Sequence, residues 1–178
     1  ISEIMDLGSQ SSFAATDNIP LELEVEETLK LLELLSTRFP LVIVIEANHD
    51  YRLARKALKV LPTEFSLLVE ETNLMQLLVR PFKNVVFVPN WYAQIEDVLI
   101  CHASKTSSVS LKVVGDLDLY FKDHHHDLGI KMPYRVLIQG HTHQLGVLYK
   151  PDLKLFESGM LCSIRSWYQK IPSRTCWI

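Results

Sequence analysis

A short apolar segment that ends in a glycine and two histidines constrains this chain more than any other stretch. Residues 135–138 read as a short buried strand, and Gly140 lets the backbone turn sharply where that strand ends. His141 and His143 therefore leave one tight loop two residues apart, where two imidazole nitrogens can converge. Because histidine is the commonest side-chain metal ligand, this stretch favours a metal site. The alternative is a surface turn that happens to hold two histidines.

Two other apolar runs also end in polar residues of this kind. Residues 41–45 form a continuous β-branched run, typical of a strand buried on both faces, and they lead into Asn-His-Asp at 48–50. Residues 98–101 form another apolar strand, and they lead directly into His102. Binding sites gather at the carboxyl ends of strands in α/β sheets, so adjacent strands would place these side chains in one crevice. Imidazole, amide and carboxylate ligands suit Mn²⁺, Fe, Zn²⁺ or Ni²⁺ better than Ca²⁺ or a thiolate-bound metal.

The rest of the chain alternates helices with strands early and forms hairpins late. The pattern predicts helices over 21–39, 51–61, 63–79 and 109–120, and further strands over 84–88, 91–95, 147–149 and 153–156. We expect Pro89-Asn90 to turn the strand at 84–88 back onto 91–95, and Pro151-Asp152 to join the last two strands. The class is therefore α/β with a mixed sheet, expected as two packed sheets with helices outside.

Length and composition indicate one ordinary globular domain. The 178 residues are 48% hydrophobic and 22% charged, which suits a single domain with a sizeable core. The net charge of -3 gives no basic footprint for nucleic acid, although an enzyme that acts on nucleic acid through metals remains compatible with it. Three cysteines without paired spacing argue against a disulfide framework and favour the reducing cytoplasm.

The sequence reads as if it begins and ends inside secondary-structure elements. The chain opens on Ile1 in mid-element and stops abruptly at Ile178. We therefore expect a single domain over 1–178 that is truncated at both ends. No run of apolar residues approaches the length of a membrane span, and no signal peptide opens the chain.

Four short motifs together resemble the calcineurin-like metallophosphoesterases. Ala-Asn-His-Asp at 47–50 is similar to the family's Gly-Asn-His-Asp/Glu, and His102 after its strand is similar to the family's lone histidine. Gly-His-Thr-His at 140–143 matches Gly-His-x-His in full, and Ser-Glu-Ile-Met-Asp at 2–6 looks like Gly-Asp-x-x-Asp. The surrounding text, including Glu-Ser-Gly-Met-Leu-Cys at 157–162, most resembles the phage-type branch, and the resemblance covers nearly the whole chain.

The resemblance implies a fold and an activity. The fold would be a mixed β-sandwich flanked by helices, in four α/β/β/α layers. The activity would be hydrolysis of a phosphomonoester or phosphodiester by a metal-bound hydroxide. One or two divalent ions would bind, with Mn²⁺ preferred over Fe, Zn²⁺ or Ni²⁺. The substrate would be a phosphate ester, with nucleotides and nucleic acids among the candidates, acted on in the cytoplasm, or in a host's cytoplasm if a phage encodes the protein, and away from membranes.

The resemblance also implies a set of metal ligands. They supply one carboxylate, one amide oxygen and three imidazoles: Glu3, Asn48, His102, His141 and His143. Glu3 would bridge two ions, and His143 would hold the first of them. The amide and the other two imidazoles would hold the second ion.

Two further residues take catalytic roles by the same resemblance. His49 would be the general acid that protonates the leaving oxygen, because a histidine titrates near neutral pH. Asp50 would orient the His49 ring, and Asp6 would lie outside the metal ligands.

Three departures from the family pattern support a second interpretation. The family's first motif, Asp-x-His, is absent, so two ligands of the first metal are missing. Glu3 replaces the bridging aspartate and moves its oxygen by one methylene, and Ala47 replaces a glycine before Asn48. The alternative is a catalytically degenerate scaffold with a phosphoesterase fold that binds a protein or nucleic-acid partner. A scaffold, however, has no physical need to retain the acid His49 together with the four ligands Asn48, His102, His141 and His143.

The histidine tract at 124–126 is the one local compositional bias. It could bind a metal, but such a run more often lies at a solvated helix end or in a loop, and we favour that interpretation.

Overall fold

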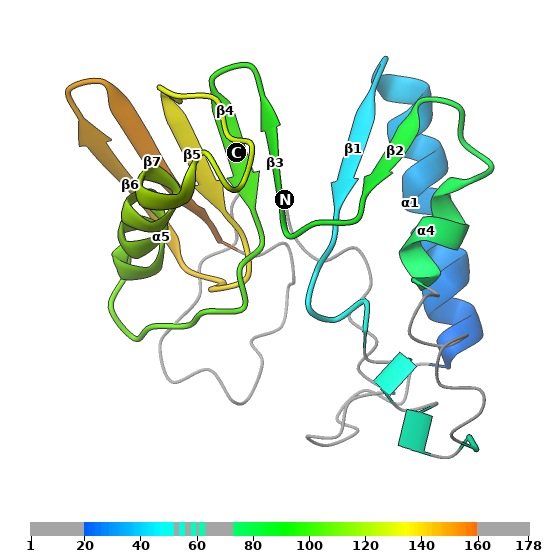
Figure 1. Ribbon diagram of the computed structural model, residues 1–178. Coiled ribbons are helices and arrows are strands. Elements are labelled where there is room, and N and C mark those ends of the chain that lie inside the picture. The colour runs from blue at the N-terminus through cyan, green and yellow to red at the C-terminus, as the bar shows by residue number, and fades with distance from the viewer. Residues whose placement is uncertain (1–19, 52–53, 56–57, 60, 63–72, 160–178) are drawn as a thin grey trace. The chain divides into compact units, whose positions relative to one another are not determined.

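A computed structural model describes residues 20–51, 54–55, 58–59, 61–62 and 73–159 (Figure 1). The chain divides into two compact units whose boundary falls between Asn90 and Trp91. Helices occur together with parallel and antiparallel strands, so the expected α/β class with mixed sheets is confirmed. The single domain and the four-layer arrangement stay predictions. In the described part of the chain, no helix combines the length and the apolar character needed to cross a membrane.

The unit that ends at Asn90 packs helices on a pair of parallel strands. The helices are α1 (Leu21–Arg38) and α4 (Leu74–Val79), and the strands are β1 (Val42–Ile45) and β2 (Val85–Val88). In the strand pair, Val42 lies opposite Val85 and Ile45 lies opposite Val88. All four elements contribute buried side chains to one core: Leu32, Val44, Met75, Val79 and Val85. In β1 only Val44 is fully buried, so the expectation of a strand buried on both faces is wrong for this residue range.

Some helices of this unit agree with their predicted ranges, and one does not. The helix expected over 21–39 is α1, and Ala54, Arg55, Leu58 and Lys59 are helical within the range 51–61. A continuous helix over 63–79 is wrong, because Asn73 has an extended backbone and α4 begins after it. The Asn73 side chain accepts hydrogen bonds from the amides of Met75 and Gln76, which is how an asparagine starts a helix. Residues 63–72 lie outside the described part.

The unit that begins at Trp91 is built on a five-stranded mixed sheet in the order β3-β4-β5-β7-β6 (Figure 1). Its strands are β3 (Tyr92–Ile95), β4 (Val98–Cys101), β5 (Val136–Gln139), β6 (Leu145–Lys150) and β7 (Leu153–Ser158). The three central strands, β4, β5 and β7, run parallel, and β3 and β6 pair antiparallel at the two edges. The carboxyl ends of the three central strands therefore lie along one edge of the sheet.

One predicted hairpin forms and another does not. Strands β6 and β7 pair around the turn at 151–152 as expected. The strand at 92–95 does not turn back onto 85–88, because β3 pairs with β4 whereas β2 pairs with β1 in a separate sheet. The β3–β4 turn lies at Glu96-Asp97, and Glu96 takes a left-handed φ of 54° there. Short apolar strands carry little information about which neighbour they pair with.

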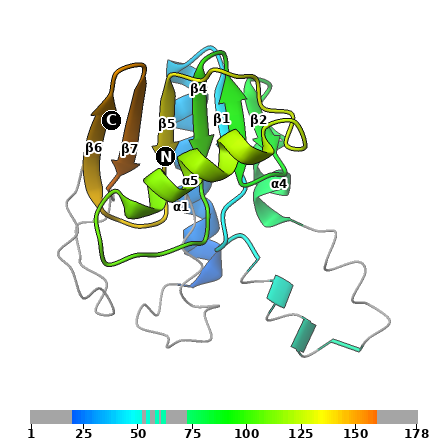
Figure 2. The same cartoon turned by 60° about the vertical axis from the view of Figure 1, so that its left-hand side comes forward.

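Helix α5 (Lys112–His124) covers one face of this sheet (Figures 1 and 2). Alternate strand residues face it, because successive side chains of a strand point to opposite faces. The core between them consists mainly of Leu99, Leu137 and Leu155 from the strands and Val113, Val114, Leu117 and Phe121 from the helix. The helix was expected over 109–120, but it begins later because Leu111 takes a left-handed φ of 63°.

A glycine ends the helical segment that follows α5. Gly129 has a φ of 65°; its amide donates to His126 O, and the next amide, of Ile130, donates to His125 O. This pair of bonds is the Schellman arrangement, which favours glycine at the left-handed position. The histidine tract lies in the last turns before this cap and is largely exposed, in agreement with the prediction of a solvated helix end.

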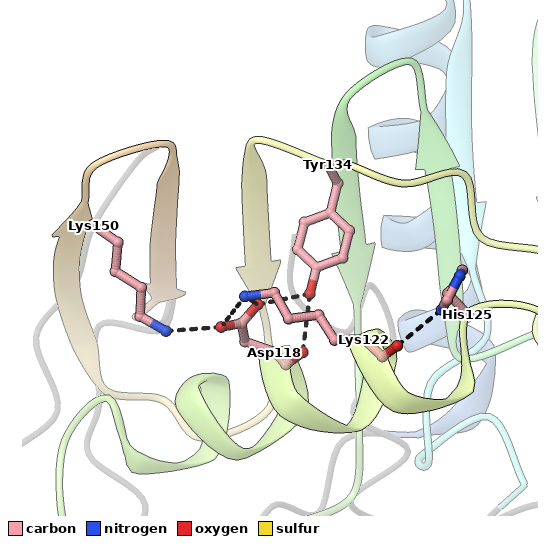
Figure 3. A network of polar contacts seen from close by, with 5 residues as sticks. All are labelled: Asp118, Lys122, His125, Tyr134 and Lys150. Carbon is pink, nitrogen blue, oxygen red and sulfur yellow. Dashed lines mark hydrogen bonds and ion pairs between the residues drawn. The ribbon is translucent and has the colours of Figure 1, made fainter.

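A buried aspartate connects α5 to two other parts of this unit (Figure 3). Asp118 is fully buried; it accepts hydrogen bonds from Tyr134 Oη at 2.8 Å, from Lys122 Nζ at 3.0 Å and from Lys150 Nζ at 2.8 Å. Burial by itself would raise the pKa of Asp118, but the bonds from Lys150, Lys122 and Tyr134 outweigh it and hold that pKa below its usual value. The charged carboxylate therefore fastens the edge strand β6 to the helix.

A second constraint on β6 is the close approach of Gly146 to the residue before α5. A Cβ added at Gly146 would lie 2.8 Å from Leu111 Cδ2. A larger side chain at this position would have to displace a leucine that packs against the core.

Two glycines provide a matched test of these helix assignments. A Cβ added at Gly115 or at Gly129 meets nothing within 4 Å, but only Gly129 has a positive φ. Gly115→Ala should raise the free energy of unfolding by about 0.5–1 kcal/mol, because alanine is the better helix residue. Gly129→Ala should lower it by about 1 kcal/mol, because a Cβ is strained in the left-handed region. Urea unfolding measures both, and equal effects would contradict the assigned helix and its cap.

Candidate functional site: a histidine pair at the carboxyl edge of the sheet

Two histidines leave neighbouring parallel strands at the same edge. His102 follows β4, and Gly140-His141 follows β5, with Cys101 and Gln139 opposite each other at the strand ends. The amide of His102 donates to Trp91 O at 2.7 Å, and the amide of Gly140 donates to Cys101 O at 2.9 Å. These backbone bonds continue the strand pairing past the last residues of the sheet, so the sheet holds the backbone of His102 and that of Gly140, directly before His141.

The two imidazole rings approach each other edge to face. The ring centres of His102 and His141 are 5.2 Å apart with an angle of 79° between the ring planes. Two imidazoles on one ion, each with a metal–nitrogen distance of about 2.1 Å, have ring centres about 4.5–5.3 Å apart. His102 is 3% exposed, and His141 is half-buried. The spacing of this pair therefore fits two ligands of a single metal ion.

The loop that carries the second histidine has an unusual backbone. His141 has a φ of 79° and His143 has a φ of 56°. Left-handed conformations cost non-glycine residues about 1–3 kcal/mol each, and they persist where surrounding contacts enforce them. The sequence places the turn at Gly140, whereas the structure places the left-handed conformation on the histidines themselves.

Hydrogen bonds around this loop hold it in place. The Thr142 amide donates to Gly140 O at 3.1 Å, and the Gln144 side chain donates from Nε2 to Ser107 O at 2.8 Å. The amide of Gly159 donates to Gln144 O at 2.7 Å. The histidine loop is therefore tied to the segment after His102 and to the end of β7.

A buried glutamine connects the two histidine segments. Gln139 is the last residue of β5; its Nε2 donates to Ala103 O at 3.1 Å, and its Oε1 accepts from the Ala103 amide at 3.4 Å. Its Oε1 also accepts from the Cys101 thiol at 2.9 Å. Burial raises the pKa of that thiol, which keeps the proton available for this bond. Gln139 thus fixes the backbone directly after His102 to the strand directly before His141.

A buried glutamate completes the same row of the sheet. Glu157 on β7 lies opposite Gln139 on β5, and it is fully buried. Its carboxylate oxygen Oε2 accepts a hydrogen bond from the Leu111 amide at 2.8 Å and another from Ser110 Oγ at 3.5 Å. Burial raises the pKa of Glu157, although the hydrogen bonds from Leu111 and Ser110 lower it in part.

The Asn-His-Asp segment belongs to the other unit and forms a tight turn after β1. Asn48 is half-buried, whereas His49 and Asp50 are 7% and 6% exposed. Asp50 Oδ2 accepts a hydrogen bond from the Ala47 amide at 2.9 Å, and the Asp50 amide donates to Ala47 O at 3.2 Å. The hydrogen bonds of Asp50 therefore stabilise the turn that contains Asn48 and His49. Its role in orienting the His49 ring stays a prediction.

A tyrosine and a glutamate lie beside this turn. Burial is the main reason, and a hydrogen bond to Glu46 the second, why the pKa of Tyr51 is raised to about 12. Glu46 Oε1 also accepts from Asn73 Nδ2 at 3.3 Å. The turn is thus linked to the start of α4 within its own unit.

The structure places the predicted ligands in three groups. His102 and His141 come together, and His143 leaves the same loop as His141. Asn48 lies in the unit that ends at Asn90, and its convergence with the histidines stays a prediction. Glu3 lies outside the described residues. Among the residues that are described, no three side chains of the His, Cys, Asp and Glu types gather closely enough to hold a metal.

Two supporting residues were not selected from the sequence. Gln139 and Glu157 act through hydrogen bonds between segments that are distant in the chain. The available signal was chemical: a glutamine and a glutamate each stand in a strand whose neighbours are mostly apolar, where an unpaired polar group is costly to bury.

Comparison of the chain with protein-family models, curated proteins and solved structures finds no match.

The Gln139 connection can be tested against a similar one at the surface. Gln139→Leu leaves the part-buried polar atoms of Ala103 without their partner and should destabilise the protein by about 1–3 kcal/mol. Gln94, which is half-buried, makes the same two-way connection to Lys131 through bonds of 2.8 Å that are exposed to solvent. Gln94→Leu should cost less, because water replaces the lost bonds. Guanidinium unfolding measures the free energy of unfolding of both variants. An equal loss of stability in the two would contradict the role of Gln139.

Proposed function

We propose that this chain is a metal-dependent phosphoesterase of the calcineurin-like type that hydrolyses a phosphomonoester or phosphodiester. The observation that carries the proposal is the His102–His141 pair, delivered by adjacent parallel strands with its rings 5.2 Å apart. The family resemblance of the motifs that contain both histidines supports the same interpretation, as does the mixed α/β class. The four-layer arrangement belongs to this proposal.

The strained loop argues that the histidine pair is more than packing. A histidine that only fills space has no need of a left-handed backbone, yet both His141 and His143 adopt one. Backbone strain of this kind is concentrated at active sites and ligand-binding loops. A ligand at the pair gives a physical reason for keeping both residues in this conformation.

Each residue has a defined part in the proposed chemistry. His102, His141, His143 and Asn48 would hold divalent ions, Mn²⁺ first among them, and Glu3 would add a carboxylate. Such ions would polarise the phosphate ester and lower the pKa of a water molecule. His49 would donate a proton to the leaving oxygen.

Metal binding is the first prediction of this proposal. The chain should bind Mn²⁺, and His141→Ala should weaken that binding by at least about tenfold, because one imidazole ligand is lost. His124→Ala is the matched control, because His124 lies exposed in the histidine tract and should leave binding unchanged. Isothermal titration with Mn²⁺ alone measures both. Absence of binding by the unaltered chain would refute the proposal and favour the partner-binding scaffold.

The role of His49 gives a second prediction that uses two substrates. His49→Ala should reduce turnover of phenyl phosphate about 10²–10⁴-fold while Mn²⁺ content stays the same, because the phenolate leaving group needs a proton. Turnover of p-nitrophenyl phosphate should fall much less, because p-nitrophenolate leaves without protonation. The corresponding diesters should behave alike if diesters are the substrates. An equal loss on both leaving groups would exclude His49 as the general acid.

A further inference from the structure

The buried side-chain amide of Gln139 stands between the two segments that carry the histidine pair. It is 0% exposed at the end of β5, two residues before His141. Glutamine is seldom buried completely, because an amide away from water is costly unless its polar atoms are hydrogen-bonded. Gln139 uses both of its polar atoms on the segment after β4, and these bonds offset the cost of burying it.

The hydrogen bonds of Gln139 fit one orientation of its amide. Oε1 accepts from the Ala103 amide at 3.4 Å and from the Cys101 thiol at 2.9 Å, whereas Nε2 donates to Ala103 O at 3.1 Å. A rotated amide would set its NH₂ group against the Ala103 amide and its oxygen against Ala103 O. The three bonds therefore agree on one arrangement, in which Gln139 holds both polar atoms of the Ala103 backbone.

These bonds complete the restraint of the His102 backbone. The peptide before the His102 Cα is held by the bond from the His102 amide to Trp91 O at 2.7 Å. The peptide after that Cα carries the Ala103 amide, which Gln139 holds. Because a residue has only two soft backbone dihedrals, holding both flanking peptides restricts the direction in which the side chain leaves. The His102 ring is thereby kept where its centre lies 5.2 Å from that of His141.

The second histidine of the pair is attached to the same glutamine through the backbone. Gln139 lies opposite Cys101 in the pairing of β4 with β5, and the amide of Gly140 donates to Cys101 O at 2.9 Å. The backbone of Gln139 therefore leads into His141, while its side chain holds the segment after His102. One residue thus connects the positions of both histidines.

We propose that Gln139 is a positioning residue that sets the spacing of the His102–His141 pair for metal binding. It acts through its two bonds to Ala103 rather than by touching the metal. An apolar side chain of the same size would fill the same buried volume, but it would release the peptide after His102. The inference rests on the proposed function, because it assigns the pair a metal to bind.

Three variants separate this role from simple stabilisation of the core. Gln139→Met has a similar shape and removes both bonds to Ala103. Cys101→Ala removes the thiol bond to Gln139 and leaves the two bonds to Ala103 in place. Asp118→Asn alters another fully buried polar side chain of the same unit, which contacts two lysines and a tyrosine rather than either histidine segment.

The first readout is Mn²⁺ affinity, measured by isothermal titration. Gln139→Met should weaken Mn²⁺ binding by about 10–100-fold, the usual effect of removing a group that orients a ligand. Cys101→Ala and Asp118→Asn should lower stability and leave Mn²⁺ affinity unchanged. Unchanged affinity in Gln139→Met overturns the proposal, and so does an equal loss of affinity in Asp118→Asn.

The second readout uses the metal-free protein. Nuclear Overhauser contacts between the ring protons of His102 and His141 should be present in the unaltered chain and in Asp118→Asn, and they should weaken in Gln139→Met. In the unaltered chain, the Ala103 amide should be protected from exchange with solvent, although Ala103 lies beyond the end of β4. Rapid exchange of this amide overturns the proposal even if Gln139→Met does not fold.

The two readouts also separate the two proposals. If the unaltered chain binds no Mn²⁺, the proposed function fails, and the ring contact alone decides whether Gln139 positions the pair. If the unaltered chain binds Mn²⁺ and Gln139→Met binds it equally well, the positioning role is wrong while the proposed function stands.

Discussion

The parallel pairing of β4, β5 and β7 is the interaction on which the candidate site depends. Parallel strands bring their carboxyl ends to one edge, and here that pairing sets Cys101, Gln139 and Glu157 in one buried row. The residues that follow the first two strands are His102 and Gly140-His141. Backbone hydrogen bonds of the sheet therefore determine which histidines meet, and the side-chain bonds of Gln139 hold the segment after His102 to the strand before His141.

The row itself shows how polar groups can be buried at an acceptable cost. Gln139 satisfies both polar atoms of the Ala103 backbone, and Glu157 satisfies the amide of Leu111. Each therefore provides a hydrogen-bond partner for a part-buried backbone group, which offsets its own burial. The bonds of Gln139 also connect the sheet to the segment directly after His102, so this side chain serves both the stability of the core and the placement of a candidate site residue.

Sequence reasoning recovered the elements better than their pairing. The range of α1 and the strand at 98–101 follow from local apolar patterns, which report directly on burial, and the strand expected over 135–138 lies one residue later, at Val136–Gln139. The partner of β3 could not be predicted, because four apolar residues fit many neighbours equally well. For the site, the motifs selected His102 and His141, which the structure brings together. The roles of Gln139 and Glu157 depend on contacts between distant segments, and no local pattern encodes those contacts.

The close approach of Gly146 to Leu111 has a consequence for how β6 finds its partner. Gly146 lies opposite Glu157, and Lys150 at the far end of the same strand binds Asp118. A shift of β6 by one residue would turn its alternate side chains to the opposite face. It would push a bulky residue against Leu111 and carry the lysine away from its aspartate. The steric contact at Gly146 and the ion pair of Lys150, near opposite ends of β6, therefore both disfavour a hairpin in the wrong register.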